Sequence, residues 1–148
     1  MRLVCLPLLL LIACLGGCAE RLPPLNDKVE GVVRYEGTPL VGVRVEFVPD
    51  TGNKSKAPSS SAITDGKGRF ALACENSKPG ALIARHRVVV LQGRGAGARD
   101  DPDAPVVARG FRLPTVYSMA NQTPLRITVT SDQHTYDLNL TTNPTPVP

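Results

Sequence analysis

Two histidines and one group of aspartates are the residues of this chain best suited to acid–base or metal chemistry. His86 alternates with Val88 and Val90 in a predicted strand, which favours an inward-facing or half-buried structural histidine over a ligand. His134 falls in a turn-like segment without a Cys, Asp or Glu at the spacing of a metal site. Residues 100–103 (Asp-Asp-Pro-Asp) could offer oxygens to Ca²⁺, but they lack the glycine and distal glutamate of an EF-hand loop, which favours an acidic surface loop. We therefore expect no metal and no cofactor.

Hydroxyl nucleophiles are equally poorly supported. Residues 59–61 (Ser-Ser-Ser) have no glycines at the positions of a nucleophile elbow, and no Ser-His-Asp order can be argued from the chain. No catalytic set is assembled by motif or spacing, so the sequence predicts a protein that is not an enzyme.

The N-terminus has the features of an export signal. Met1 and Arg2 provide a short basic start, and residues 3–15 are apolar apart from Pro7. This apolar stretch is shorter than the roughly 20 residues needed to span a bilayer, whereas its length and flanks fit a secretory signal. We expect residues 1–17 to be removed from the mature chain.

The cysteines at the end of this segment predict a lipid anchor. Residues 15–18 (Leu-Gly-Gly-Cys) resemble the lipobox of bacterial lipoproteins, in which the cysteine receives the lipid and becomes the new N-terminus. Cys18 is the preferred lipidation site, because a full apolar region precedes it and polar residues follow directly. Cys14, which ends a second, overlapping match at residues 11–14 (Leu-Ile-Ala-Cys), is the alternative. Ala19 stands after Cys18 where an aspartate tends to retain lipoproteins at the inner membrane, so the resemblance favours the outer membrane of the cell envelope.

Charge and composition restrict the remaining partners. The net charge is +4, and the 17 Lys and Arg residues are scattered, without a run of four and without interleaved aromatic residues. This pattern argues against nucleic acid as a partner. Cys74 is the one cysteine left in the expected domain, and its alternation with Phe70 and Leu72 predicts a small buried apolar side chain rather than a disulfide or metal ligand.

The 148-residue chain is long enough for one domain after removal of the leader. We assign residues 18–27 to a tether, 28–140 to the folded domain and 141–148 to a disordered tail. The chain has no Trp and only three Phe and three Tyr, so Val, Leu and Ile must build the core, a bias that suits strands.

Short alternating segments occupy this domain, and none has a convincing helical period. The central feature is a hairpin at residues 64–70 (Thr-Asp-Gly-Lys-Gly-Arg-Phe), in which two glycines permit positive φ and Asp65 can bond the backbone of the turn. Tyr117 is expected in an extended crossover that rejoins the core. The seven predicted strands, which together favour an all-β, antiparallel sandwich, lie near residues 29–35, 41–47, 62–64, 70–74, 84–91, 125–129 and 136–140.

Three segments in order resemble one family. Residues 30–33 (Glu-Gly-Val-Val), 37–47 (Gly-Thr-Pro-Leu-Val-Gly-Val-Arg-Val-Glu-Phe) and the hairpin at 64–70 are similar to the carboxypeptidase regulatory-like, transthyretin-like domain of bacterial lipoproteins. The resemblance extends over about residues 28–140, with departures at Ala84 and His86, where the family commonly has Gly and Tyr. It implies a seven-stranded antiparallel β-sandwich and a non-catalytic, surface-anchored module, and it does not imply a ligand.

Two functions remain open from the sequence. The first is a non-catalytic, lipid-anchored envelope lipoprotein with a structural or accessory role and the membrane as its partner. The alternative is a ligand-binding module for a glycan, a peptide or a partner protein that uses the 93–112 loop. That alternative requires convergence of four loop arginines, namely Arg94, Arg99, Arg109 and Arg112.

Overall fold

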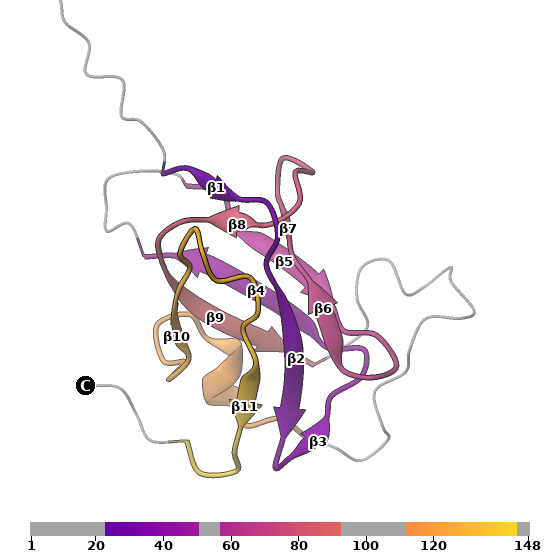
Figure 1. Ribbon diagram of the computed structural model, residues 1–148. Helices are drawn as coiled ribbons and strands as arrows, with labels where there is room; N and C mark the ends of the chain where they lie inside the picture. The colour runs from indigo at the N-terminus through magenta and orange to yellow at the C-terminus, as the bar shows by residue number, and fades with distance from the viewer. Residues whose placement is uncertain (1–22, 51–56, 93–111, 145–148) are drawn as a thin grey trace, which may run out of the picture.

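The structure, a computed structural model, describes residues 23–50, 57–92 and 112–144. Within these ranges the chain is all-β, with eleven short strands, one 3₁₀ turn and no α-helix (Figure 1). The strands are β1 (Leu25–Asn26), β2 (Glu30–Tyr35), β3 (Thr38–Pro39), β4 (Arg44–Pro49), β5 (Ser60–Ile63), β6 (Arg69–Ala71), β7 (Ala73–Cys74), β8 (Ala81–Leu82), β9 (Arg85–Leu91), β10 (Arg126–Thr128) and β11 (Leu138–Leu140).

The larger sheet has the order β10-β9-β4-β5-β7, and all its neighbours are antiparallel. Its centre is the pairing of β4 with β9, which runs from Arg44 opposite Leu91 to Pro49 opposite His86. The predicted alternation in these strands is confirmed, because Val45 and Phe47 on β4 and Val88 on β9 are fully buried. Period-two spacing directs these side chains to a single face of the sheet.

A second sheet of four strands is built around β2, and β1 and β8 form a third sheet of two strands. The four-stranded sheet is called the smaller sheet below. One side of β2 pairs with β6 along its first half and with β3 along its second half, and the other side pairs with β11. The β11 strand is parallel to β2, so the prediction of a wholly antiparallel arrangement is wrong. The reason is that β10 belongs to the larger sheet, and the chain crosses between sheets before β11 instead of turning back on β10.

The predicted turn at residues 64–70 is confirmed, but the two-stranded hairpin is not. The Asp65 amide donates to the Arg69 carbonyl at 2.9 Å, and Asp65 Oδ1 accepts from the amides of Lys67 and Arg69. Gly68 has a φ of +72°, as its position in the turn requires. Beyond the turn, however, β5 pairs with β4 and β7 whereas β6 pairs with β2, so the turn connects the two sheets.

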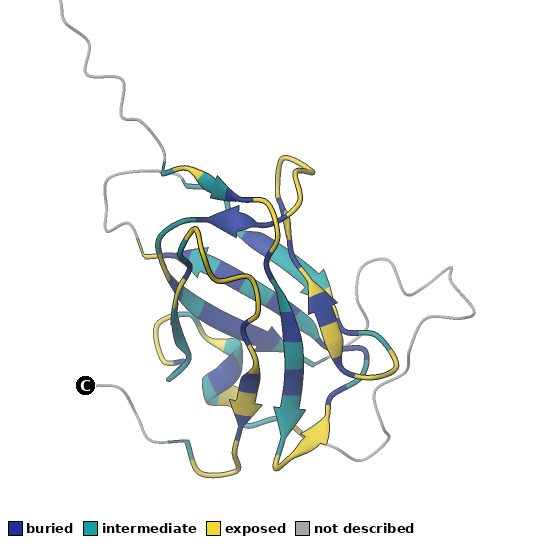
Figure 2. Cartoon of the chain, viewed as in Figure 1, coloured by how far each residue is buried: buried dark blue, intermediate teal, exposed yellow. Residues whose placement is uncertain are grey.

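Buried side chains from both sheets meet between them (Figure 2). The rings of Phe47 and Phe70 lie 6.2 Å apart at an angle of 50° and join the larger sheet to the smaller one. The backbone at Tyr136 packs closely against Gly31 of β2. Only glycine fits at position 31, because a Cβ on this residue would lie 2.0 Å from the Tyr136 carbonyl oxygen. Valine and leucine side chains make up most of this buried cluster, as the composition predicts.

The segment before β10 differs from the predicted extended crossover. It contains a 3₁₀ turn, η2 (Thr115–Ser118), which places Tyr117 in the core with 2% of its surface exposed. The Tyr117 hydroxyl donates to the Thr141 carbonyl at 3.1 Å and accepts from the Thr141 amide at 2.9 Å. Tyr117 thus rejoins the core as expected, but through a tight turn.

Both boundaries of the fold lie outside residues 28–140. Strand β1, which the sequence assigned to the tether, pairs with β8, with Leu25 opposite Leu82. At the other end, the Thr142 amide and hydroxyl both donate to Glu36 Oε1, so the first residues of the assigned tail are bonded to the fold.

Candidate functional site

The expected lipidation sites, Cys18 and Cys14, lie outside the described residues. So do the aspartates of residues 100–103 and three of the four loop arginines, Arg94, Arg99 and Arg109. Arg112 is described and exposed. The convergence of these arginines therefore remains a prediction.

His86 lies in the core, as its alternation predicted. Its side chain is 1% exposed, and Nε2 lies 2.8 Å from the Leu82 carbonyl, which makes this nitrogen the donor. Nδ1 has no hydrogen-bond partner, and the ring packs 5.6 Å from that of Phe47. Burial lowers the pKa of His86, while the backbone groups of Leu82 and Phe47 act in the opposite direction. His86 is thus a neutral structural residue.

The serines at 59–61 form no nucleophilic site within the described chain. Ser59 Oγ lies 3.2 Å from Glu46 and 2.8 Å from Glu75, and neither histidine bonds to these serines. Across the same described ranges, no group of three or more His, Cys, Asp or Glu side chains comes together as metal ligands.

An open groove crosses the outer side of β2 and β6. It encloses about 540 Å³, and Val32, Ile63 and Ala71 contribute apolar surface to it. Its charged residues are already paired at 2.9–3.3 Å, in three ion pairs: Glu30 with Lys28, Asp65 with Arg69 and Asp137 with Arg34.

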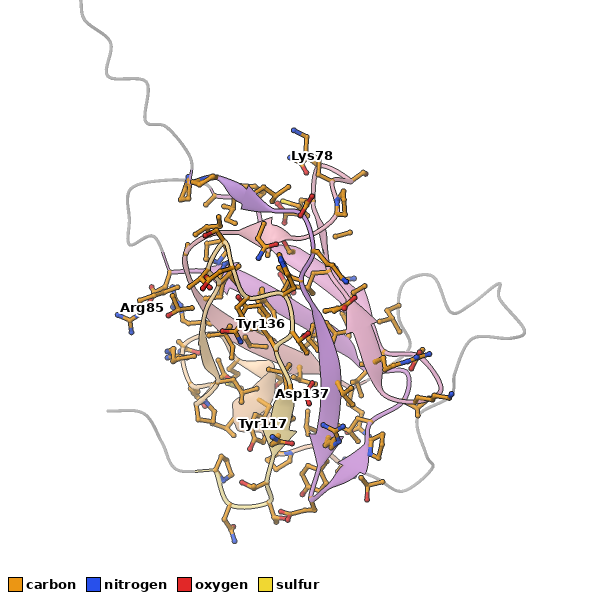
Figure 3. The ribbon with its side chains drawn as sticks, viewed as in Figure 1. Lys78, Arg85, Tyr117, Tyr136 and Asp137 are labelled. Atoms are coloured by element: carbon orange, nitrogen blue, oxygen red, sulfur yellow. The ribbon has the colours of Figure 1, made fainter. Side chains whose placement is uncertain are left out.

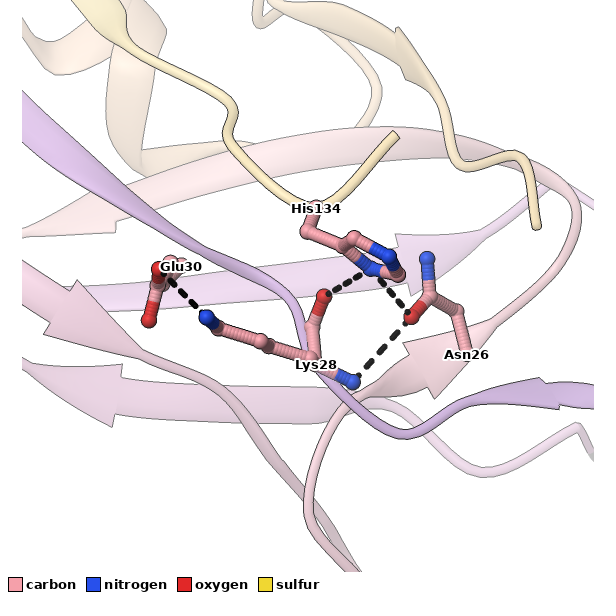
Figure 4. Close-up of polar contacts among 4 residues, drawn as sticks. All are labelled: Asn26, Lys28, Glu30 and His134. Carbon is pink, nitrogen blue, oxygen red and sulfur yellow. Dashed lines mark hydrogen bonds and ion pairs between the residues drawn. The ribbon is translucent and has the colours of Figure 1, made fainter. Parts of the chain in front are cut away.

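A connected group of polar residues lies at the N-terminal end of the described fold. We call Asn26, Lys28, Glu30 and His134 the N-terminal latch (Figure 4). Asn26 is 4% exposed, and its amide nitrogen donates to the carbonyls of Thr130 and Gln133 at 2.7 and 2.9 Å. Its Oδ1 accepts from the Lys28 amide at 3.1 Å. A buried amide with both ends bonded fixes the position of the strand that carries it.

His134 completes the latch. Its Nδ1 lies 3.2 Å from Asn26 Oδ1 and 3.1 Å from the Lys28 carbonyl, and because both partners are acceptors, Nδ1 carries the proton. Hydrogen bonds from the Thr130 hydroxyl and the Asp132 backbone hold the pKa of Asp132 below its ordinary value, with a smaller contribution from His134. The Lys28–Glu30 ion pair is largely exposed and adds little stability.

Close backbone packing supports the latch from the other side of β1. Gly80 has a φ of +94°, and a Cβ at this position would lie 1.8 Å from the Asn26 carbonyl oxygen. The Ile83 amide donates to the Pro24 carbonyl at 2.8 Å. The segment that follows the expected anchor is thus attached to the fold from its first described residues.

The sequence analysis missed this latch. It placed His134 in a turn, whereas this residue lies in the irregular connection by which the chain crosses from β10 to β11. It assigned Asn26 to the tether, because one buried Asn in a two-residue strand has no periodic signal. The hydrogen bonds of the latch join β1 to the segment before β11, so the latch attaches the N-terminal strand to the fold.

Comparison with known proteins adds no family. No family model matches the chain, and neither the curated proteins nor the solved structures include a match. Among the described residues, no helix combines the length and apolar character that a membrane crossing needs.

Proposed function

We propose that this chain is a lipid-anchored lipoprotein of the cell envelope whose folded part has a structural or accessory role and no catalytic one. The observation that carries the proposal is the Leu-Gly-Gly-Cys motif at residues 15–18 after an apolar leader. A second feature supports it, since the fold begins within a few residues of Cys18. In this proposal the folded domain follows closely after the lipidated cysteine.

For the domain itself we propose a transthyretin-like, carboxypeptidase regulatory-like β-sandwich. The order of the motifs at residues 30–33, 37–47 and 64–70 supports this assignment, as do two facing sheets around an aliphatic core. The parallel pairing of β11 with β2 means that the proposed sandwich is mixed rather than wholly antiparallel. The outer membrane is the proposed location because Ala19 follows Cys18.

Acylation in a bacterial host tests the proposal. The full chain and its variants are expressed with labelled palmitate, and label in the protein band is measured together with the membrane-bound fraction. Cys18→Ala should lose the label, whereas Cys5→Ala, a matched change in the same leader, should keep it. If Cys14→Ala loses the label and Cys18→Ala keeps it, the lipidation site is Cys14 rather than Cys18. A double Cys14→Ala, Cys18→Ala variant that is still acylated would refute the anchor.

A ligand-binding module is the second candidate, and the groove over β2 and β6 is the observation that favours it. Its paired charges suit a neutral glycan or an uncharged peptide segment. The soluble mature chain carrying Cys18→Ser is titrated with envelope glycans while amide NMR shifts are followed. Shifts at Val32, Ile63 and Ala71 would support binding in the groove, and shifts confined to the 93–112 segment would support the loop instead. A titration without shifts would remove this candidate.

A further inference from the structure

We infer that the bilayer holding the lipid of Cys18 also faces the β1–β8 end of the fold, so that this end is the membrane-proximal surface of the protein. The inference rests on the proposed lipid anchor and goes further, because it states the orientation of the domain. The occupant of the surface is the headgroup layer of the protein's own membrane.

The first step is that β1 cannot act as a flexible spacer. It pairs with β8 in two-residue register, Asn26 is fixed by hydrogen bonds at both ends of its amide, and Gly80 packs directly on the Asn26 backbone. The chain between the lipid and the fold therefore ends near Pro23 rather than at residue 28.

The second step is the maximum length that this connection can span. From Cys18 to Pro23 there are five Cα–Cα steps (23 − 18 = 5), which span at most about 17–18 Å when fully extended. A domain of about 100 residues has a radius of gyration of about 13 Å, which corresponds to a diameter of about 34 Å. A tether of half the diameter cannot extend around the domain, so the end that carries β1 must remain near the bilayer.

The third step identifies the residues that this places near lipid. Lys78 lies in the turn before Gly80, and its carbonyl accepts from the Cys74 amide at 2.8 Å. Figure 3 shows Lys78 at the end of the fold where β1 and β8 lie. Thr38 of β3 marks the opposite end, because the six residues of β2 separate the two ends by about 20 Å.

Charge does not account for this orientation. Exposed Lys78 at the β1–β8 end is accompanied by exposed Asp27, and Lys28 is paired with Glu30. The end has mixed charge, so its position near the bilayer should follow from tether length and should not depend on salt.

The experiment uses the full lipidated protein in vesicles of phosphatidylethanolamine and phosphatidylglycerol. In a Cys74→Ala background, a fluorophore is attached to Lys78→Cys or to Thr38→Cys, and its quenching by a nitroxide on the lipid headgroup is measured. We expect several-fold stronger quenching at position 78 than at position 38, at both low and high salt. Equal quenching at the two positions, or stronger quenching at 38, would overturn the inference.

A longer tether provides the matched control. A Gly/Ser insert of about 12 residues after Leu22 adds about 40 Å of reach, more than the diameter of the domain, and should bring the quenching ratio close to one. If quenching at position 78 still exceeds that at position 38 after the insert, the fold itself binds the membrane surface. The same holds if salt abolishes the difference in the original protein. Either result would overturn the inference from tether length. Mass analysis of the same sample separates the two proposals: protein without lipid overturns the anchor and the inference together, whereas lipidated protein with equal quenching overturns the orientation alone.

Discussion

Replacement of Phe70 by alanine should remove much of the stability of this fold. Phe70 is 4% exposed, and its ring lies against that of Phe47 where the two sheets meet. Loss of a buried phenylalanine side chain destabilises proteins by about 3–5 kcal/mol, because the surrounding side chains fill the cavity only in part. Domains of this size are stable by about 5–15 kcal/mol, so Phe70→Ala should remove a large fraction of the total.

Urea denaturation of the soluble mature chain carrying Cys18→Ser, followed by far-UV circular dichroism, measures this change. With a urea dependence of about 1–3 kcal/mol per molar, the midpoint should fall by about 1–5 M. Met119→Ala is the matched control, because Met119 is 40% exposed and its loss should change stability by no more than about 0.5 kcal/mol. A double-mutant cycle with Phe47→Ala should give a coupling of about 0.5–1.5 kcal/mol. Equal midpoints for Phe70→Ala and Met119→Ala would refute the assignment of the core.

Three further substitutions test other parts of the structure. Gly80→Ala should destabilise the chain by about 1–3 kcal/mol in urea melts, because of its positive φ and its contact with β1, whereas Gly66→Ala, with open space around it, should be neutral. Tyr117→Phe loses both hydrogen bonds to Thr141 and should lower stability by about 1–3 kcal/mol; an unchanged melting temperature would contradict the role of η2. Because the folded pKa of His86 lies below its unfolded value of about 6.5, the unfolded state binds more protons and stability should fall as the pH decreases below about 6.5. His86→Gln should lessen this decline between pH 7.5 and 5.5, and an unchanged pH profile in the variant would show that His86 is not responsible.

Local signals in the sequence were sufficient for strand faces and for turn chemistry. The alternation of Val45 and Phe47 predicts the buried face of β4, since period-two spacing is a property of the strand alone. The side-chain bonds of Asp65 and the positive φ of Gly68 could likewise be predicted, because the turn depends on residues within it.

Strand partners could not be predicted in the same way. A period-two pattern specifies which side chains are buried but not which strand lies alongside, so β6 was expected beside β5 and instead pairs with β2. The parallel placement of β11 has the same cause, because the sequence contains no signal for the crossing between sheets.

The latch was missed for a different reason. Asn26 becomes a structural residue only through acceptors at Thr130 and Gln133, more than 100 positions away in the chain. Its position beside Pro23 and Pro24 made the segment look like a linker. A buried polar residue in a very short strand is recognisable only after its distant partners are placed.

The most direct test of the proposed lipoprotein is the mass of the mature N-terminus. Trypsin digestion of the membrane-extracted protein should release residues 18–21 (Cys-Ala-Glu-Arg), because Arg21 is the first cleavage site after Cys18. The account predicts that this peptide carries acyl chains on Cys18 and that no peptide retains residues 1–17. A mature chain that begins at an acylated Cys14 would move the anchor to that residue. A chain that carries no acyl group on either cysteine, or that begins at any other residue, would contradict the account.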